Sequence, residues 1–250
     1  MPFTVQYLLG AVSTLPTATV LAAASLRASW ARGKIAALAA DPSDAYAAEN
    51  AALGAKGARL RIVLIGDSRI ARWPRRLLPD AWEVINRGIG GETSVQTAGR
   101  FETDALALAP DVLVIGSGVN DIVAAGLLGA RGAAALEALP MRLSELATRG
   151  AASGALTLTA TIARPARPPF WERPFWPRTL QAHVDQTNLA LRAWAQTTRD
   201  RRLDCAQALS PDEGQPLAAP YAAGALHFSD AAYAELSRAL LALVEAARPG

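Results

Sequence analysis

The chain has 250 residues, of which 51% are hydrophobic, so it is long enough and apolar enough to bury the core of one α/β domain. Its net charge is +3, and its arginines are scattered rather than gathered into a basic stripe, which argues against a nucleic-acid partner. One cysteine, Cys205, and two histidines, His183 and His227, exclude a disulfide within the chain and argue against a multi-histidine metal centre.

An uncharged, mostly apolar stretch covers residues 4–26, and its length matches the roughly 20 residues needed to cross a bilayer. Polar residues and one proline dilute its hydrophobicity. Two alternatives stay open: a membrane anchor or interfacial helix, and a helix packed on the domain. If the stretch crosses a membrane, the positive charges of Arg27, Arg32 and Lys34 would keep the rest of the chain on the cytoplasmic side. The protein would then be membrane-associated through residues 4–26, and cytoplasmic otherwise.

The sequence divides into two regions. Residues 1–58 are predicted to hold the apolar segment and an alanine-rich helical connector. Residues 59–250 are predicted to form the globular domain, because strand-like and helix-like patterns alternate only there.

The domain is predicted to be a doubly wound parallel α/β sheet. Short, continuously apolar segments are typical of strands buried on both faces, and they occur at Leu60–Ile65, Trp82–Asn86, Val112–Ile115, Ala155–Ala160 and Arg202–Cys205. Apolar residues with helical spacing lie between and after them, at Leu136, Leu139, Leu143 and Leu146, at Val184, Thr187, Leu191 and Trp194, and at Tyr233, Leu236, Leu240 and Leu243. Strand–helix alternation of this kind places ligands beyond the carboxyl ends of the strands.

One segment, Ala163–Leu180, interrupts the alternation. It is rich in proline, arginine and aromatic residues, and proline keeps it out of helix interiors and central strands. It follows the fourth predicted strand, on the ligand side of the sheet. Two interpretations stay open for its aromatic side chains: a rigid surface loop, or a lid or groove that accepts apolar acyl chains or meets lipid. These side chains are Phe170, Trp171, Phe175 and Trp176.

Small polar segments follow the first three predicted strands and precede the last helix. They read GDS at 66–68, NRGIGGETS at 86–94, GSGVND at 116–121 and GALHFSD at 224–230. Together they suit acyl transfer. Ser68 would attack a carbonyl carbon, and His227 would take its proton and later deliver it to the leaving alcohol. The backbone N–H groups of Ser68 and Gly91 and the side-chain amide of Asn120 would bind the oxyanion.

These four segments, in this order, resemble the blocks of the SGNH (GDSL-like) hydrolases, from Leu60 to Val244. The resemblance implies a three-layer, flavodoxin-like fold and ester hydrolysis without metal or cofactor. It identifies Ser68 as the nucleophile, Gly91 and Asn120 as oxyanion residues and His227 as the base.

One position departs from the family pattern. An aspartate usually stands three residues before the histidine and orients it, whereas here the residue is Gly224. Three explanations stay open. The site is a dyad with His227 held by backbone, or a substitute acid completes a triad, or the site is weakened or inactive. The candidates for a substitute acid are Asp204, Asp212 and Glu213, since Asp230 is expected to cap the last helix with Ser229.

The function predicted from the sequence is therefore that of a serine esterase or lipase-like acyl hydrolase acting on a small-molecule carboxylic ester. The apolar N-terminus and the aromatic segment favour lipid or lysophospholipid esters, and acetyl groups on glycans stay open. The alternatives are a catalytically impaired relative that binds an ester or glycan, and an acyltransferase that uses the same site.

Overall fold

The computed structural model describes residues 17–39, 41–170, 173, 176–197, 201–210 and 214–247. In this part of the chain, five parallel strands form one sheet in the order β2-β1-β3-β4-β5. The strands are β1 (Arg61–Gly66), β2 (Glu83–Gly88), β3 (Val112–Gly116), β4 (Leu156–Ala160) and β5 (Arg201–Leu203). Because β1 has β2 on one side and β3 on the other, the strand order reverses there. The loops that follow these strands open the crevice in which doubly wound sheets bind ligands.

The strands are short and continuously apolar because both faces of the sheet are covered. Ile62 and Leu64 of β1 lie in one core, and Val63 and Ile65 lie in the other. All four are fully buried. This alternation follows from the two-residue period of a strand, and it explains why no polar residue interrupts the run.

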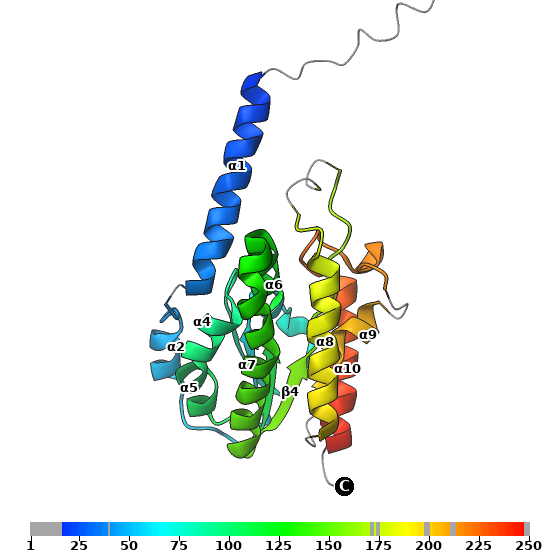
Figure 1. Ribbon diagram of the computed structural model, residues 1–250. Helices are drawn as coiled ribbons and strands as arrows, with labels where there is room; N and C mark the ends of the chain where they lie inside the picture. Colours follow the sequence, from blue (N-terminus) through cyan, green and yellow to red (C-terminus); the bar gives the residue numbers. More distant parts are fainter. Residues whose placement is uncertain are drawn as a thin grey trace, which may run out of the picture.

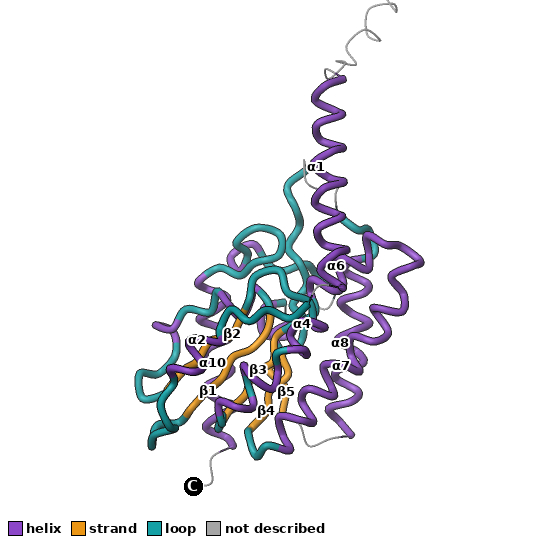
Figure 2. Tube along the Cα trace, turned by 90° about the vertical axis from the view of Figure 1, so that its left-hand side faces the viewer, coloured by secondary structure: helices purple, strands orange, loops and turns teal. Residues whose placement is uncertain are grey.

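Helices cover the two faces and complete the three layers (Figures 1 and 2). The first core packs against α9 and α10, and the second packs against α5, α6, α7 and α8. The helices are α1 (Thr17–Ala36), α2 (Ala47–Ala52), α3 (Ser68–Ala71), α4 (Ser94–Gly99), α5 (Phe101–Asp104), α6 (Val119–Leu128), α7 (Ala133–Ala152), α8 (Leu180–Thr197), α9 (Cys205–Leu209) and α10 (Asp230–Ala247).

The sequence-based prediction of a three-layer, doubly wound parallel sheet is confirmed. Each predicted strand coincides with an observed one to within two residues at either end. The three helical spacings fall in α7, α8 and α10. At the start of α10, Ser229 Oγ accepts a hydrogen bond from the backbone N–H of Ala232 and so caps the helix. Asp230 instead forms an ion pair with Arg76.

The N-terminal region contacts the domain through the C-terminal end of α1 and through the residues that follow it. Helix α1 projects from the body, and its C-terminal end lies beside α6 (Figures 1 and 2). Further along, the Tyr46 hydroxyl donates to the Gly88 carbonyl, and Arg87 donates to Asn50. Residues that the sequence assigned to a connector therefore contact the end of β2.

The predicted membrane segment, residues 4–26, lies mostly outside the described residues, which begin at Thr17. Among the helices that the structure describes, none has both the length and the apolar character needed to cross a bilayer.

Candidate active site

Ser68 stands where the sequence predicts a nucleophile. It is the first residue of α3, directly after β1 and Asp67. The Asp67 carboxylate accepts the backbone N–H of Arg69 at 2.9 Å and so starts the helix. The N–H of a first helical residue has no partner within the helix, so that of Ser68 is free to meet a ligand. The Ser68 hydroxyl is half-buried and lies 3.2 Å from Nε2 of His227.

His227 lies on a short turn that several contacts hold in place. An antiparallel bridge joins Ala222 to Phe228, and the N–H of Ala223 donates to the His227 carbonyl. These contacts close the turn around the histidine. They bring a residue 159 positions away in sequence within hydrogen-bond distance of Ser68.

Arg69 ties this turn to the nucleophile, a role that the sequence did not suggest. Its Nε donates to the Leu226 carbonyl and its Nη1 to the Ala163 carbonyl, each at 2.9 Å. The guanidinium lies 4.6 Å from the centre of the Phe228 ring. Because Arg69 directly follows Ser68, one buried side chain fixes the position of His227 relative to the nucleophile.

The surroundings of His227 are positively charged. Burial lowers the pKa of its imidazole, and the nearby charges of Arg72, Arg69 and Lys34 lower it further. No carboxylate within the described residues hydrogen-bonds this imidazole. The histidine is therefore neutral at pH 7 and can accept a proton, but it lacks an anion that would stabilise the imidazolium.

Of the three predicted substitute acids, Asp204 is engaged elsewhere. Its carboxylate accepts hydrogen bonds from Arg192 and from the Thr161 hydroxyl. Asp212 and Glu213 lie outside the described residues. At Gly224 the backbone has φ +87°, and a Cβ built there meets no atom within 4 Å.

The predicted oxyanion residues follow β2 and β3, the strands on either side of β1. Gly91 has φ +85° in the loop after β2. The next residue, Glu92, forms a buried ion pair with Arg100, which also binds Asp104. This buried network anchors the loop that carries Gly91. It could not be predicted from a local sequence pattern, because Glu92 lies in a loop and Arg100 and Asp104 lie beyond α4.

Asn120 occupies the second position of α6. Its Nδ2 donates to the Glu92 carbonyl at 2.9 Å, and its Oδ1 accepts a hydrogen bond from the Lys34 ammonium at 2.8 Å. In the sequence, Lys34 is only one of the positive charges that follow the apolar segment. Lys34 and Asn120 are 86 residues apart, so no local pattern connects them.

Two buried carboxylates frame these loops. Burial raises the pKa of Asp67 to about 6, although the charge of Arg69 opposes this shift. Asp121 accepts hydrogen bonds from the backbone N–H and the hydroxyl of Ser94 and so holds the start of α4 against α6. Among the described residues, no group of three or more His, Cys, Asp or Glu side chains is arranged to hold a metal ion.

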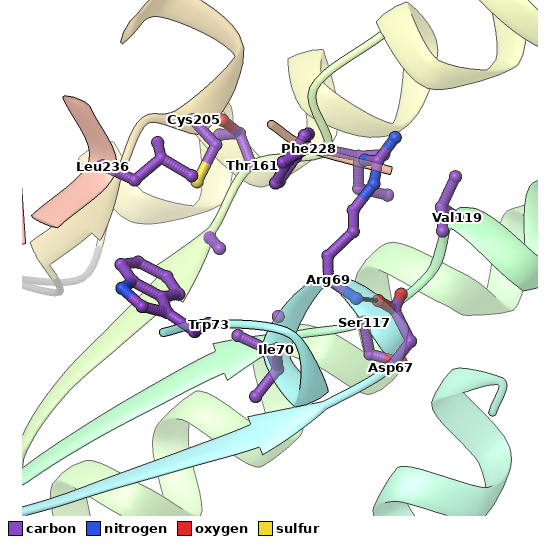
Figure 3. A pocket seen from close by; sticks show the side chains of 13 residues that line it. Asp67, Arg69, Ile70, Trp73, Ser117, Val119, Thr161, Cys205, Phe228 and Leu236 are labelled. Carbon is purple, nitrogen blue, oxygen red and sulfur yellow. Dashed lines mark hydrogen bonds between the residues drawn. The ribbon is translucent and has the colours of Figure 1, made fainter. Parts of the chain in front are cut away.

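A small cavity lies beside the nucleophile, lined by Asp67, Arg69, Trp73 and Phe228 among others (Figure 3). Its volume is about 30 Å³, enough for about one water molecule and too small for an acyl chain. A larger open groove of about 550 Å³ runs past Gly224 and is lined mainly by alanine and proline residues.

The predicted aromatic residues do not line this groove where the structure describes them. Phe170 is 73% exposed. The Trp176 ring packs at 6.1 Å from that of Trp30 in α1. Trp171 and Phe175 lie outside the described residues.

Comparisons with known proteins identify the family and the fold. The sequence profile of the GDSL-like lipase/acylhydrolase family matches residues 54–235. A search of the curated proteins returned no match.

Solved structures with the same fold include a GDSL-like lipase from Bacteroides thetaiotaomicron, with a TM-score of 0.70 and 24% identity over 81% of this chain and 97% of that one. An acetylxylan esterase from Geobacillus stearothermophilus has a TM-score of 0.57 and 20% identity over 75% of this chain and 94% of its own. Because the family profile covers most of the sequence, the protein belongs to the GDSL-like lipase/acylhydrolase family.

Proposed function

We propose that the protein is a serine esterase that cleaves carboxylic esters through an acyl-serine intermediate. The observation that carries this proposal is the 3.2 Å contact between Ser68 Oγ and His227 Nε2, with Gly91 and Asn120 placed after the strands on either side of β1. Family membership supports ester hydrolysis in general, and the roles of these residues are our assignment.

The reaction begins when His227 takes the Ser68 proton and the serine oxygen bonds to the ester carbonyl carbon. The N–H groups of Ser68 and Gly91 and the Asn120 amide stabilise the oxyanion that forms. The imidazolium then delivers its proton to the leaving alcohol, and the carbon–oxygen bond breaks to leave an acyl-serine.

Hydrolysis of that acyl-serine completes the cycle. His227 takes a proton from a water molecule, whose oxygen attacks the acyl carbon, and the proton returns to Ser68 as the acid leaves. Both Ser68 and His227 are partly exposed, so water reaches the acyl group. This exposure favours hydrolysis over transfer to another acceptor.

The substrate is expected to be a small ester with an apolar acyl or alcohol group. The groove beside the His227 turn supports this expectation, because its lining includes Ala166, Pro169 and Leu217. The names of the structural neighbours do not choose between substrates, since one is a lipase and another an acetylxylan esterase.

Kinetics on p-nitrophenyl esters of increasing chain length test the proposal. We expect kcat/KM to be at least as high for butyrate as for acetate. Ser68→Ala should remove the activity without unfolding the protein. The matched control is Ser153→Ala, whose hydroxyl binds the Gly150 carbonyl at the end of α7, away from the site. Undiminished activity in purified Ser68→Ala protein would contradict the assignment, and absence of activity in the natural protein would favour an impaired, ester-binding relative.

A further inference from the structure

The side-chain amide of Asn120 has one orientation that its neighbours dictate. The Lys34 ammonium can only donate a hydrogen bond, so the amide oxygen must face it. The Glu92 carbonyl can only accept, so the amide nitrogen must face that side. One of the two Nδ2 hydrogens is therefore used by Glu92, and the other is left for a ligand.

Helix α1 brings Lys34 to this place. Trp30 and Lys34 are four residues apart and so lie on the same face of the helix. The Trp30 ring packs against Trp176, and Lys34 reaches Asn120 in the first turn of α6. Directly after α1, the Ala37 carbonyl accepts a hydrogen bond from the Thr93 hydroxyl. The contacts of Trp30 before Lys34 and of Ala37 after it thus fix the position of Lys34 relative to Asn120.

We propose that Lys34 is a positioning residue of the active site, which acts through Asn120 by holding the amide ready for the oxyanion. The inference rests on the esterase function proposed above. A charged donor on Oδ1 draws electron density from the amide and strengthens its N–H as a donor. The ammonium also adds a positive charge behind the point where negative charge develops.

The environment of Lys34 agrees with this role. Its side chain is half-buried, and burial lowers the pKa of its ammonium, whereas the Asp67 carboxylate raises it. A lysine that served only to solvate the helix would reach water instead. The sequence contains one other lysine, Lys56, which pairs with Asp111 just before β3, at the opposite edge of the sheet.

A double-mutant cycle on p-nitrophenyl acetate tests the proposal, using the full-length protein, Lys34→Met, Asn120→Ala and the double variant. We expect Lys34→Met to lower kcat about tenfold with little change in KM, because the interaction matters most in the transition state. Asn120→Ala should lower kcat by ~10²–10³. The double variant should be only slightly slower than Asn120→Ala alone, because most of the effect of Lys34 passes through the amide.

Lys56→Met is the matched control and should leave kcat unchanged. Thermal unfolding of each variant checks that the fold is intact. If Lys34→Met does not fold, Lys34→Gln replaces it in the same cycle. Fully additive losses, or a Lys34 variant as fast as the natural protein, would overturn the proposal while leaving the esterase function standing. Absence of Ser68-dependent activity in the natural protein would contradict both the role of Lys34 and the esterase function.

Discussion

His227 is the residue whose surroundings lead most directly to a measurable pH dependence. Only the neutral imidazole can take the Ser68 proton, so activity is lost when the pH falls below the pKa of His227. Burial and the charges of Arg72, Arg69 and Lys34 lower this pKa from 6.5. We therefore expect the acidic limb of the kcat/KM profile to be centred below pH 6.5. The pH profile of kcat/KM on a p-nitrophenyl ester measures this. An acidic limb centred above pH 7 would contradict it and would indicate a carboxylate beside the imidazole.

Gly224 is the residue at which an acid can be restored. Aspartate there would stand three residues before His227, where it can accept the Nδ1–H and stabilise the imidazolium. The space around its Cβ is open, whereas φ +87° strains any side chain by about 1–2 kcal/mol. We expect Gly224→Asp to raise kcat about tenfold, well below the ~10⁴ that the aspartate contributes in serine proteases. Steady-state kinetics measure the gain, and the acidic limb should move to higher pH with it.

Gly224→Asn is the matched control, because it carries the same backbone strain and side-chain size without the negative charge. It should lower stability equally and give no gain in kcat. The dyad would be contradicted if Gly224→Asp gave no gain while Asp212→Asn or Glu213→Gln lost most of the activity. Asp204→Asn should reduce stability rather than kcat, because Asp204 binds Arg192 and Thr161.

At the scale of elements, α1 and α2 contribute differently to the domain. A chain that begins at Asp41 loses Lys34 but keeps the Tyr46 and Asn50 contacts to the end of β2. A chain that begins at Ala51 loses all three. We expect both to fold, since the family profile begins at residue 54. The first should show the kcat loss of Lys34→Met, and the second should also be less stable by about 1–3 kcal/mol, because a buried carbonyl and Arg87 lose partners.

Urea unfolding and steady-state kinetics of the two shortened chains measure these effects. Unchanged kcat in the chain from Asp41 would show that α1 contributes nothing to the reaction. Equal stability of the two chains would show that the contacts of Tyr46 and Asn50 do not stabilise the domain.

The elements themselves were predictable because their signals are local. The continuously apolar segments Ile62–Ile65 and Val112–Ile115 are by themselves typical of buried strands. The helical spacing of apolar residues in α7, α8 and α10 likewise indicates which face of each helix is buried. Segment 163–180 and the N-terminal helix carry no such periodicity. Whether α1 meets a membrane or packs on the domain depends on contacts such as Trp30 with Trp176, which are far apart in sequence.

At the scale of the whole molecule, the parallel sheet explains which site residues could be predicted. Ser68, Gly91 and Asn120 follow consecutive strands, and parallel strands bring their carboxyl ends to one edge. Their proximity therefore follows from topology. Arg69, Lys34 and the Glu92–Arg100 ion pair take part through side chains whose partners lie on other elements, so only the folded structure identifies them.

The distribution of charge around the site also belongs to the whole fold. Arg69 and Arg72 come from α3 and Lys34 from α1, and together they make the surroundings of the Ser68–His227 pair positive. Such a field favours a serine alkoxide and an oxyanion, and it disfavours the imidazolium that must form with them. The molecule is thus expected to be a working but slow esterase unless an acid joins His227.

Reaction with an organophosphonate ester tests the central claim most directly, because it requires an activated serine and no knowledge of the natural substrate. Mass spectrometry of the labelled protein should show one added phosphonyl group, on the peptide that contains Ser68. Ser68→Ala should not react, and His227→Ala should react far more slowly, whereas Ser153→Ala should react like the natural protein. Failure of Ser68 to label under conditions that label a known serine esterase, or labelling that persists in Ser68→Ala, would contradict the account.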